Sequence, residues 1–253
     1  MEFKTKTTSW LLTYPNPNDK IRIFCLPCAG SGASIYGQWH KFLPKDIGVY
    51  PIQLPGRENR ICEDPILDMD SLVKYITNSI LPYLDKPFLF FGHSLGARVA
   101  FEITHNLNSV YNKIPNCLIV SGSRAPHIPE PNPIHFLPDN EFLNAIGKLS
   151  GIPNIIFENK ELMNLFLPIL RADYTIDETY VFKDKSPLPC PIIAFGGVYD
   201  TEASEDEIQD WSAYTSNLFS YSMIEGDHFF FKSHVEELLN KISKIISNYK
   251  VSS

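Results

Sequence analysis

Cysteine is scarce in this chain: there are five residues in 253, an odd number, at positions 25, 28, 62, 117 and 190. The disulfide frameworks of small secreted proteins use an even and much denser set. We therefore expect reduced thiols and a cytoplasmic protein. Cys25 and Cys28 form a C-x-x-C pair, which could indicate a metal or redox site, but no second pair or histidine cluster accompanies it. Structural thiols are the favoured interpretation, and no metal is expected.

Basic charge and long apolar runs are lacking as well. The chain has 22 Lys and Arg against 29 Asp and Glu, a formal net charge of −7, with no run of basic residues. This balance offers no basic surface for nucleic acid. No apolar stretch approaches the roughly 18 to 20 residues that span a membrane. The N-terminal segment MEFKTKTTSWLL has no apolar core of a secretory signal. We expect neither a nucleic-acid nor a membrane partner.

The chain does contain a regular alternation of short apolar runs and helical patterns. Six runs predict strands that are buried on both faces, at 21–26, 49–54, 88–91, 117–120, 192–195 and 219–224. Helices are predicted at about 69–84, 95–107, 205–214 and 235–246. Alternating strand and helix signals favour an α/β fold, in which helices flank both faces of a mostly parallel sheet.

Residues 121–191 break this alternation. Ten of the 20 prolines lie within 124–191, and helical patterns occur near 140–149 and from about 159 to 172, interrupted by Pro168. A structureless loop of this length is uncommon in a compact domain. We therefore predict a helical lid insertion at roughly 124–190, over the carboxyl edge of the sheet, within a single domain that spans residues 1–253. A small second domain is the alternative.

A G-x-S-x-G motif, Gly92-His93-Ser94-Leu95-Gly96, is the clearest chemical signal. It follows a predicted strand and precedes a predicted helix, which is the strand–turn–helix context of a nucleophile elbow. Glycines two residues before and after the serine let strand and helix approach without Cβ clashes. Ser94 is the predicted catalytic nucleophile, and a turn without chemistry is the alternative.

A serine hydroxyl needs a base to accept its proton and an acid to orient that base. After a nucleophile elbow the chain order is Ser, then Asp or Glu, then His. Among seven histidines, His228 alone lies in a loop between the last predicted strand and the last helix. Asp200 follows the preceding strand, whereas Asp206 and Asp210 fall within the next predicted helix. His228 is the predicted base and Asp200 the predicted acid.

Attack on a carbonyl also requires backbone donors for the oxyanion. The N–H of Leu95, directly after the nucleophile, is one predicted donor. The other is the N–H of Ala29, in the loop that follows the strand at 21–26. Glycines in that loop could also suggest phosphate binding, but neither G-K-[ST] nor G-x-G-x-x-G follows them.

Five segments together resemble the type II thioesterases, stand-alone α/β-hydrolases that accompany nonribosomal peptide and polyketide synthases and are related to the medium-chain fatty-acyl thioesterase. The resemblance covers almost the whole chain. The segments are Leu26-Pro27-Cys28-Ala29-Gly30, Leu54-Pro55-Gly56-Arg57-Glu58, Gly92–Gly96, Leu167-Pro168-x-Leu170-Arg171-Ala172-Asp173 and Gly226-Asp227-His228. The second and fourth are the specific ones, because generic esterases of this fold do not usually carry them.

The resemblance implies a serine hydrolase that cleaves acyl thioesters from the phosphopantetheine arm of acyl or peptidyl carrier proteins. The cleavage would remove stalled or wrong acyl groups (editing) or release the product. It implies no cofactor beyond that arm, a transient carrier-protein partner and a monomer. It leaves Arg57, Arg171 and Asp173 as structural residues, the last two fixing the lid to the body. A small-molecule carboxylesterase or a fatty-acyl thioesterase on the same fold is the alternative, and a non-catalytic binding protein is a third hypothesis.

Overall fold

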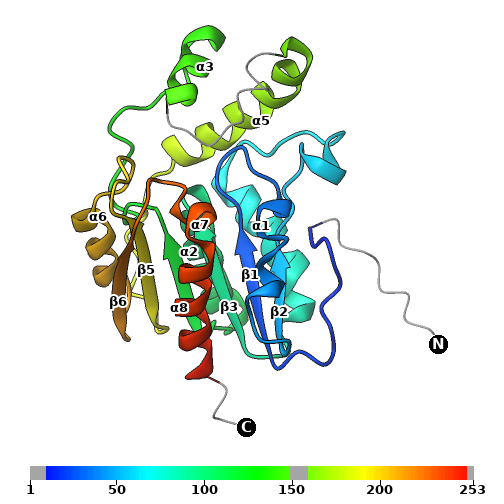
Figure 1. Ribbon diagram of the computed structural model, residues 1–253, viewed down its shortest axis with the longest axis vertical. Coiled ribbons are helices and arrows are strands. Elements are labelled where there is room, and N and C mark those ends of the chain that lie inside the picture. Colours follow the sequence, from blue (N-terminus) through cyan, green and yellow to red (C-terminus); the bar gives the residue numbers. More distant parts are fainter. Residues whose placement is uncertain (1–9, 149–158, 250–253) are drawn as a thin grey trace, which may run out of the picture.

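A six-stranded sheet, in the order β2-β1-β3-β4-β5-β6, forms the centre of the computed structural model, which describes residues 10–148 and 159–249 (Figure 1). Every neighbouring pair of strands is parallel. The strands are β1 (Ile21–Leu26), β2 (Ile47–Pro51), β3 (Phe88–His93), β4 (Cys117–Ser121), β5 (Ile192–Gly197) and β6 (Phe219–Ile224). The predicted α/β-hydrolase fold class is confirmed.

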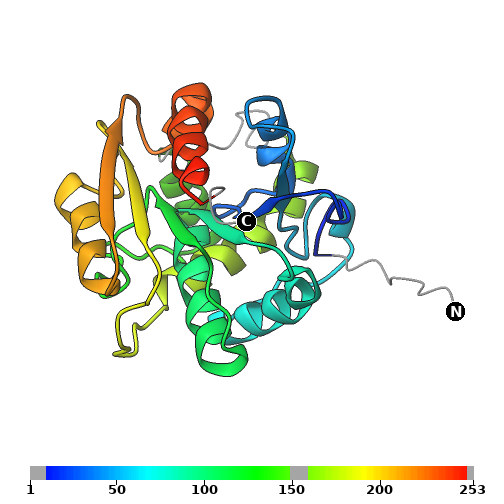
Figure 2. The ribbon, with the colours of Figure 1, turned by 90° about the horizontal axis from the view of Figure 1, so that it is seen from below.

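Helices cover both faces of the sheet. They are α1 (Met69–Ile80), α2 (Leu95–Tyr111), α3 (Asp139–Lys148), α5 (Lys160–Glu178), α6 (Glu205–Gln209), α7 (Phe230–Ser233) and α8 (Val235–Ser247). Seen from below, α8 lies on one side of the sheet and α1 and α2 lie on the other (Figure 2). None of these helices, within the part of the chain that the structure describes, is long and apolar enough to cross a membrane.

Alternate strand residues supply the two cores. In β3, Phe88 and Phe90 pack with the residues of α1 and α2, whereas Leu89 and Phe91 pack with those of α8. Side chains of a strand point alternately to opposite faces, so a strand that is covered on both sides must be apolar throughout. This is why the central strands are recognisable as continuous apolar runs, whereas β6, at the edge of the sheet, was wrongly predicted to be buried on both faces, because Ser220 and Tyr221 are exposed.

Local signals set several helix ends. Asp68 precedes α1 and accepts a hydrogen bond from the N–H of Ser71, and Asn159 precedes α5 and accepts from two first-turn N–H groups. At α6, Ser204 and Glu207 form a capping box. Such caps satisfy backbone donors that have no partner within the helix.

Several elements differ from the sequence-based prediction. β2 begins at Ile47 rather than 49, because Ile47 and Gly48 already pair with β1. The helix predicted at 205–214 is α6 followed by a 3-10 turn, and α7 was not predicted. The predicted break at Pro168 is wrong, since α5 runs through it. Proline costs a helix interior about 3 kcal/mol, and burial of α5 residues on both sides of Pro168 offsets this cost.

Helices α3 and α5 of the predicted lid lie above the carboxyl edge of the sheet (Figure 1). Phe142 and Ile146 of α3 form a small apolar cluster with Leu170 of α5. Arg171 joins the same helices, because it donates to Asp139 at 2.7 Å and to the carbonyl of His135. Residues 149–158, including the last residue of the helix predicted at 140–149, lie outside the described residues.

Candidate active site

Ser94 occupies a strained turn between β3 and α2, with φ of 55° and ψ of −123°. The two flanking glycines are sterically required there. A Cβ on Gly92 would lie 2.1 Å from the carbonyl oxygen of Gly96, and one on Gly96 would lie 2.3 Å from that of Leu26. These distances are far inside van der Waals contact, so the G-x-S-x-G pattern follows from the close packing of α2 on β1 and β3. The turn has the geometry of a nucleophile elbow.

Asp200 and His228 meet at the carboxyl edge of the sheet. Nδ1 of His228 lies 2.9 Å from Oδ2 of Asp200, whose side chain is completely buried. The other oxygen, Oδ1, accepts a hydrogen bond of 2.8 Å from the N–H of Glu202. With both oxygens engaged, the carboxylate can hold the imidazole in one orientation and one tautomer.

His93, next to the nucleophile, packs beneath His228. The two ring centroids are 4.9 Å apart, and Nδ1 of His93 lies 3.0 Å from the hydroxyl of Ser121. Burial lowers the pKa of His93 well below its ordinary value, and the charge of His228 lowers it further. A neutral ring at this point supports the side chain of His228 without competing with it for a proton.

Three of the five predicted site residues line one cavity of about 350 Å³. Its wall includes Ser94, His228 and Ala29, together with Ile146 of α3 and Phe166 and Leu170 of α5. Helices α3 and α5 therefore supply apolar side chains to the lining of this cavity. No hydrogen bond joins the Ser94 hydroxyl to His228 among the described residues, and such contacts often tighten only when a substrate is bound.

The loop from Cys28 to Ser31 carries the predicted donor Ala29. Its chain direction is reversed by a turn in which the N–H of Ser31 donates to the carbonyl of Cys28 at 3.1 Å, and Gly30 has a φ of +72°. Leu95, the other predicted donor, is the first residue of α2. Leu95 therefore directly follows Ser94, and the loop that carries Ala29 follows β1, the neighbour of β3 in the sheet.

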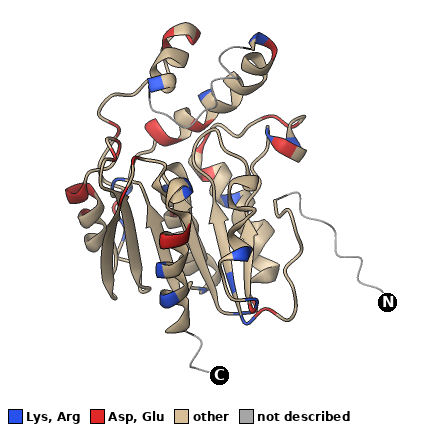
Figure 3. Ribbon diagram, viewed as in Figure 1, with Lys and Arg blue, Asp and Glu red and all other residues tan. Residues whose placement is uncertain are grey.

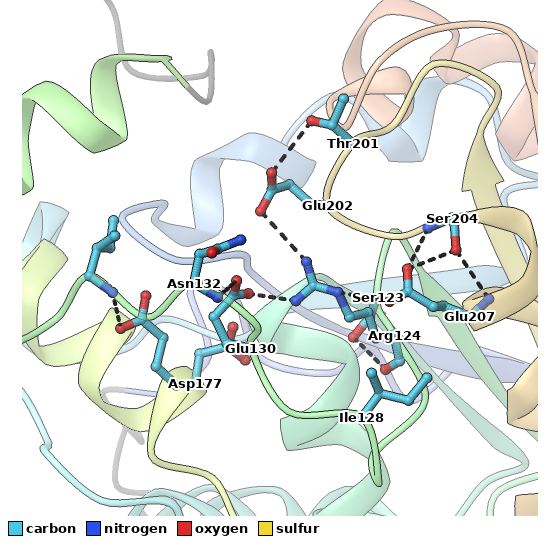
Figure 4. Close-up of polar contacts among 12 residues, drawn as sticks. Ser123, Arg124, Ile128, Glu130, Asn132, Asp177, Thr201, Glu202, Ser204 and Glu207 are labelled. Carbon is cyan, nitrogen blue, oxygen red and sulfur yellow. Dashed lines mark hydrogen bonds and ion pairs between the residues drawn. The ribbon is translucent and has the colours of Figure 1, made fainter.

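A second wall of the cavity is charged. Arg124 lies 2.5 Å from Glu130, 3.3 Å from Glu207 and 4.0 Å from Glu202 (Figure 4). Burial raises the pKa of Glu202. Acidic residues also mark α5 and α6 around this edge of the sheet (Figure 3). One guanidinium therefore pairs with three carboxylates, two from loops and one, Glu207, from α6.

Two residues that the sequence left as structural lie beside the site. Arg57 and Asp173 form a buried ion pair at 2.6 and 2.8 Å, and Asp173 also accepts from the N–H of Gly30 at 2.7 Å. Arg171, by contrast, joins α5 to α3. The specific LPGRE and LPxLRAD segments were visible in the sequence, but their pairing across 116 residues was not.

All five cysteines are free thiols, and Cys25 and Cys28 are both buried. Burial raises the pKa of each of these two thiols, which disfavours the thiolate that metal binding and redox chemistry need. Within residues 10–148 and 159–249, no group of three or more His, Cys, Asp or Glu side chains could hold a metal ion.

Comparisons with known proteins agree with this geometry. The profile of the thioesterase domain family matches residues 21–246. Linear gramicidin dehydrogenase LgrE of Brevibacillus parabrevis is 40% identical over 96% of this chain and 94% of that protein. Gramicidin S biosynthesis protein GrsT of Aneurinibacillus migulanus is 38% identical over 96% of each chain.

A solved structure is similar over nearly the full length. The type II thioesterase BorB from the borrelidin biosynthetic cluster superposes with a TM-score of 0.85 at 30% identity, covering 95% of this chain and 98% of that one.

Proposed function

This chain belongs to the type II thioesterase family, and from that premise we propose that it hydrolyses acyl thioesters on the phosphopantetheine arm of acyl or peptidyl carrier proteins. Ser94 is the nucleophile, His228 the base and Asp200 the acid of a catalytic triad. The carrier protein is a transient partner that brings the arm to a monomeric, cytoplasmic enzyme.

The proposed reaction has two halves. The hydroxyl of Ser94 attacks the thioester carbonyl while His228 accepts its proton, and the N–H groups of Ala29 and Leu95 stabilise the oxyanion. Collapse breaks the C–S bond, and the proton on His228 passes to the departing thiol. A water molecule, deprotonated by His228, then attacks the acyl-serine, and the acid leaves as Ser94 regains its proton.

One observation carries this proposal: His228, which the buried Asp200 holds in place, and the strained Ser94 turn border the same cavity. A non-catalytic binding protein would have no need of a buried carboxylate with both oxygens engaged. The cavity volume of about 350 Å³ lies in the range of small-molecule sites, so it suits an acyl group and the end of its arm, with the carrier protein remaining outside.

Relatives support the carrier-bound thioester as substrate. GrsT is named for gramicidin S biosynthesis and BorB for the borrelidin cluster. LgrE carries a dehydrogenase name, but the thioesterase profile spans residues 21–246 of this chain, which favours hydrolysis.

Substrate preference tests the proposal. The same acyl group is presented on a carrier protein, on free pantetheine and as a simple alkyl ester, and release of the acid is measured for each. We expect kcat/KM to be highest for the carrier-bound thioester. A preference for the simple ester would instead make the protein a carboxylesterase.

A further inference from the structure

We propose that Asp173 is a positioning residue for the oxyanion hole: its carboxylate on α5 holds the turn that presents the N–H of Ala29. The inference rests on the proposed function, because it assumes that Ala29 is a donor to the oxyanion. It assigns to a lid helix a part in the chemistry at the sheet edge, beyond closing the cavity.

The turn has two accessible forms. The hydrogen bond from Ser31 to Cys28, 3.1 Å long, and the φ of +72° at Gly30 make it a type II turn with Ala29 and Gly30 at its centre. A type I turn would close the same hydrogen bond with the central peptide group reversed. Glycine at the third position tolerates both forms, so the sequence of the turn alone does not choose between them.

Asp173 favours the type II form of the turn. Its Oδ2 accepts the N–H of Gly30 at 2.7 Å, and this N–H belongs to the central peptide group. Reversal of that group would turn the carbonyl of Ala29 toward a carboxylate that is 1% exposed. Two oxygen acceptors would then face each other and the N–H would lose its partner, which is especially unfavourable for a buried charged group.

Arg57 fixes the carboxylate itself. It donates to both oxygens of Asp173, at 2.6 and 2.8 Å, and also to the carbonyl of Ser31 at 3.2 Å. The guanidinium is almost completely buried, so the pair acts in a medium in which charge-assisted hydrogen bonds are strong. The turn is thus held at two consecutive residues, at the N–H of Gly30 and at the carbonyl of Ser31.

Leu170 adds a packing contact from the same face of α5. A Cβ built on Gly30 would lie 2.5 Å from Cδ2 of Leu170, so this side chain already fills the space above the turn. Asp173 and Leu170 are three residues apart and therefore neighbours on one helix face. A shift of this part of α5 would move both contacts at once, and the turn that carries Ala29 would move with them.

The substitution Asp173→Asn tests the proposal. An amide has one acceptor oxygen where the carboxylate has two, so its NH2 group must face either Arg57 or the N–H of Gly30. We expect kcat to fall at least about tenfold, since small displacements of reacting groups are costly, while KM changes less than about threefold. A boronic acid that forms a tetrahedral adduct on the nucleophile should bind more weakly by a similar factor.

Asp19→Asn is the matched control. Asp19 is likewise buried and paired with an arginine, Arg22, at 3.4 Å, but it precedes β1 at the opposite edge of the sheet. Its substitution should lower thermal stability while leaving kcat and boronic acid affinity unchanged. If Asp173→Asn folds and keeps its kcat, or loses kcat with unchanged boronic acid affinity, the positioning role is wrong.

The double substitution Arg57→Met, Asp173→Asn provides a second test, including the case in which the single variant does not fold. Removal of the guanidinium frees the amide oxygen to accept the N–H of Gly30. We expect boronic acid affinity to recover toward the wild-type value, although the ion pair is gone. A double variant that folds with no recovery would overturn the proposal. Failure of the proposed function would appear separately, as full thioesterase activity in Ser94→Ala.

Discussion

Nδ1 of His228 lies 2.9 Å from Oδ2 of Asp200, although the two residues belong to loops that follow different strands. β5 and β6 are adjacent and parallel, so their following loops leave the sheet side by side. Gly197 permits the approach, since a Cβ there would lie 2.5 Å from the carbonyl oxygen of Asp227. The contact between the Asp200 carboxylate and the His228 imidazole therefore follows from the order of the strands in the sheet.

Asp200→Asn should leave the fold intact and lower kcat by about four orders of magnitude, because an amide favours the wrong tautomer of the base. Steady-state kinetics on an acyl thioester would measure the change. Asp206→Asn is the control, because Asp206 lies in the exposed first turn of α6 and should retain wild-type kcat. Comparable activity in both variants would exclude Asp200 as the acid.

Gly96→Ala should destabilise the protein by about 3 kcal/mol or prevent folding, because the new methyl group would overlap the carbonyls of Leu26 and Pro27. Urea unfolding measures the effect. Gly37→Ala is the matched control: Gly37 has an ordinary φ of −60°, and its nearest contact would be 3.1 Å. If Gly96→Ala were no less stable than Gly37→Ala, the steric account of the motif would be wrong.

Stability should fall as the pH drops below about 6.5, in part because of His93. The folded state holds the pKa of this buried histidine well below its ordinary value. The unfolded chain therefore binds a proton that the folded chain does not, and each pH unit below about 6.5 removes up to about 1.4 kcal/mol.

Comparison of urea unfolding at pH 7 and pH 5 isolates this contribution. We expect wild type to lose about 2 kcal/mol more than His93→Gln over this interval. The same loss in both proteins would show that His93 becomes protonated as readily in the folded state as in the unfolded one.

The strands and the chain order of the catalytic candidates could be predicted because they depend on local and topological rules. Continuous apolar runs indicate buried parallel strands. In a parallel sheet, the loops that follow the strands all begin at the same edge, the carboxyl edge. That is why Ser94, Asp200 and His228 could be chosen from the sequence without any contact being known.

Tertiary contacts determine the features that could not be predicted from the sequence. Pro168 predicts a helix break by local rules, yet the buried side chains of α5 on both sides of it keep the helix continuous. Arg57 and Asp173 belong to recognisable segments, but a sequence motif does not show which residue its side chains contact. The support that His93 gives to His228 follows from a tilted ring contact between the end of β3 and the loop after β6, and such a contact has no sequence signal.

The central claim is that Ser94 cleaves a carrier-bound acyl thioester, and release of the free carrier thiol by Ser94→Ala tests it most directly. Ser109→Ala is the control, because Ser109 lies on the exposed surface near the other end of the same helix, where its hydroxyl donates to the carbonyls of His105 and Asn106. We expect thiol release to fall by at least about a thousandfold in Ser94→Ala and to be unchanged in Ser109→Ala. Equal release by Ser94→Ala and wild type would contradict the account.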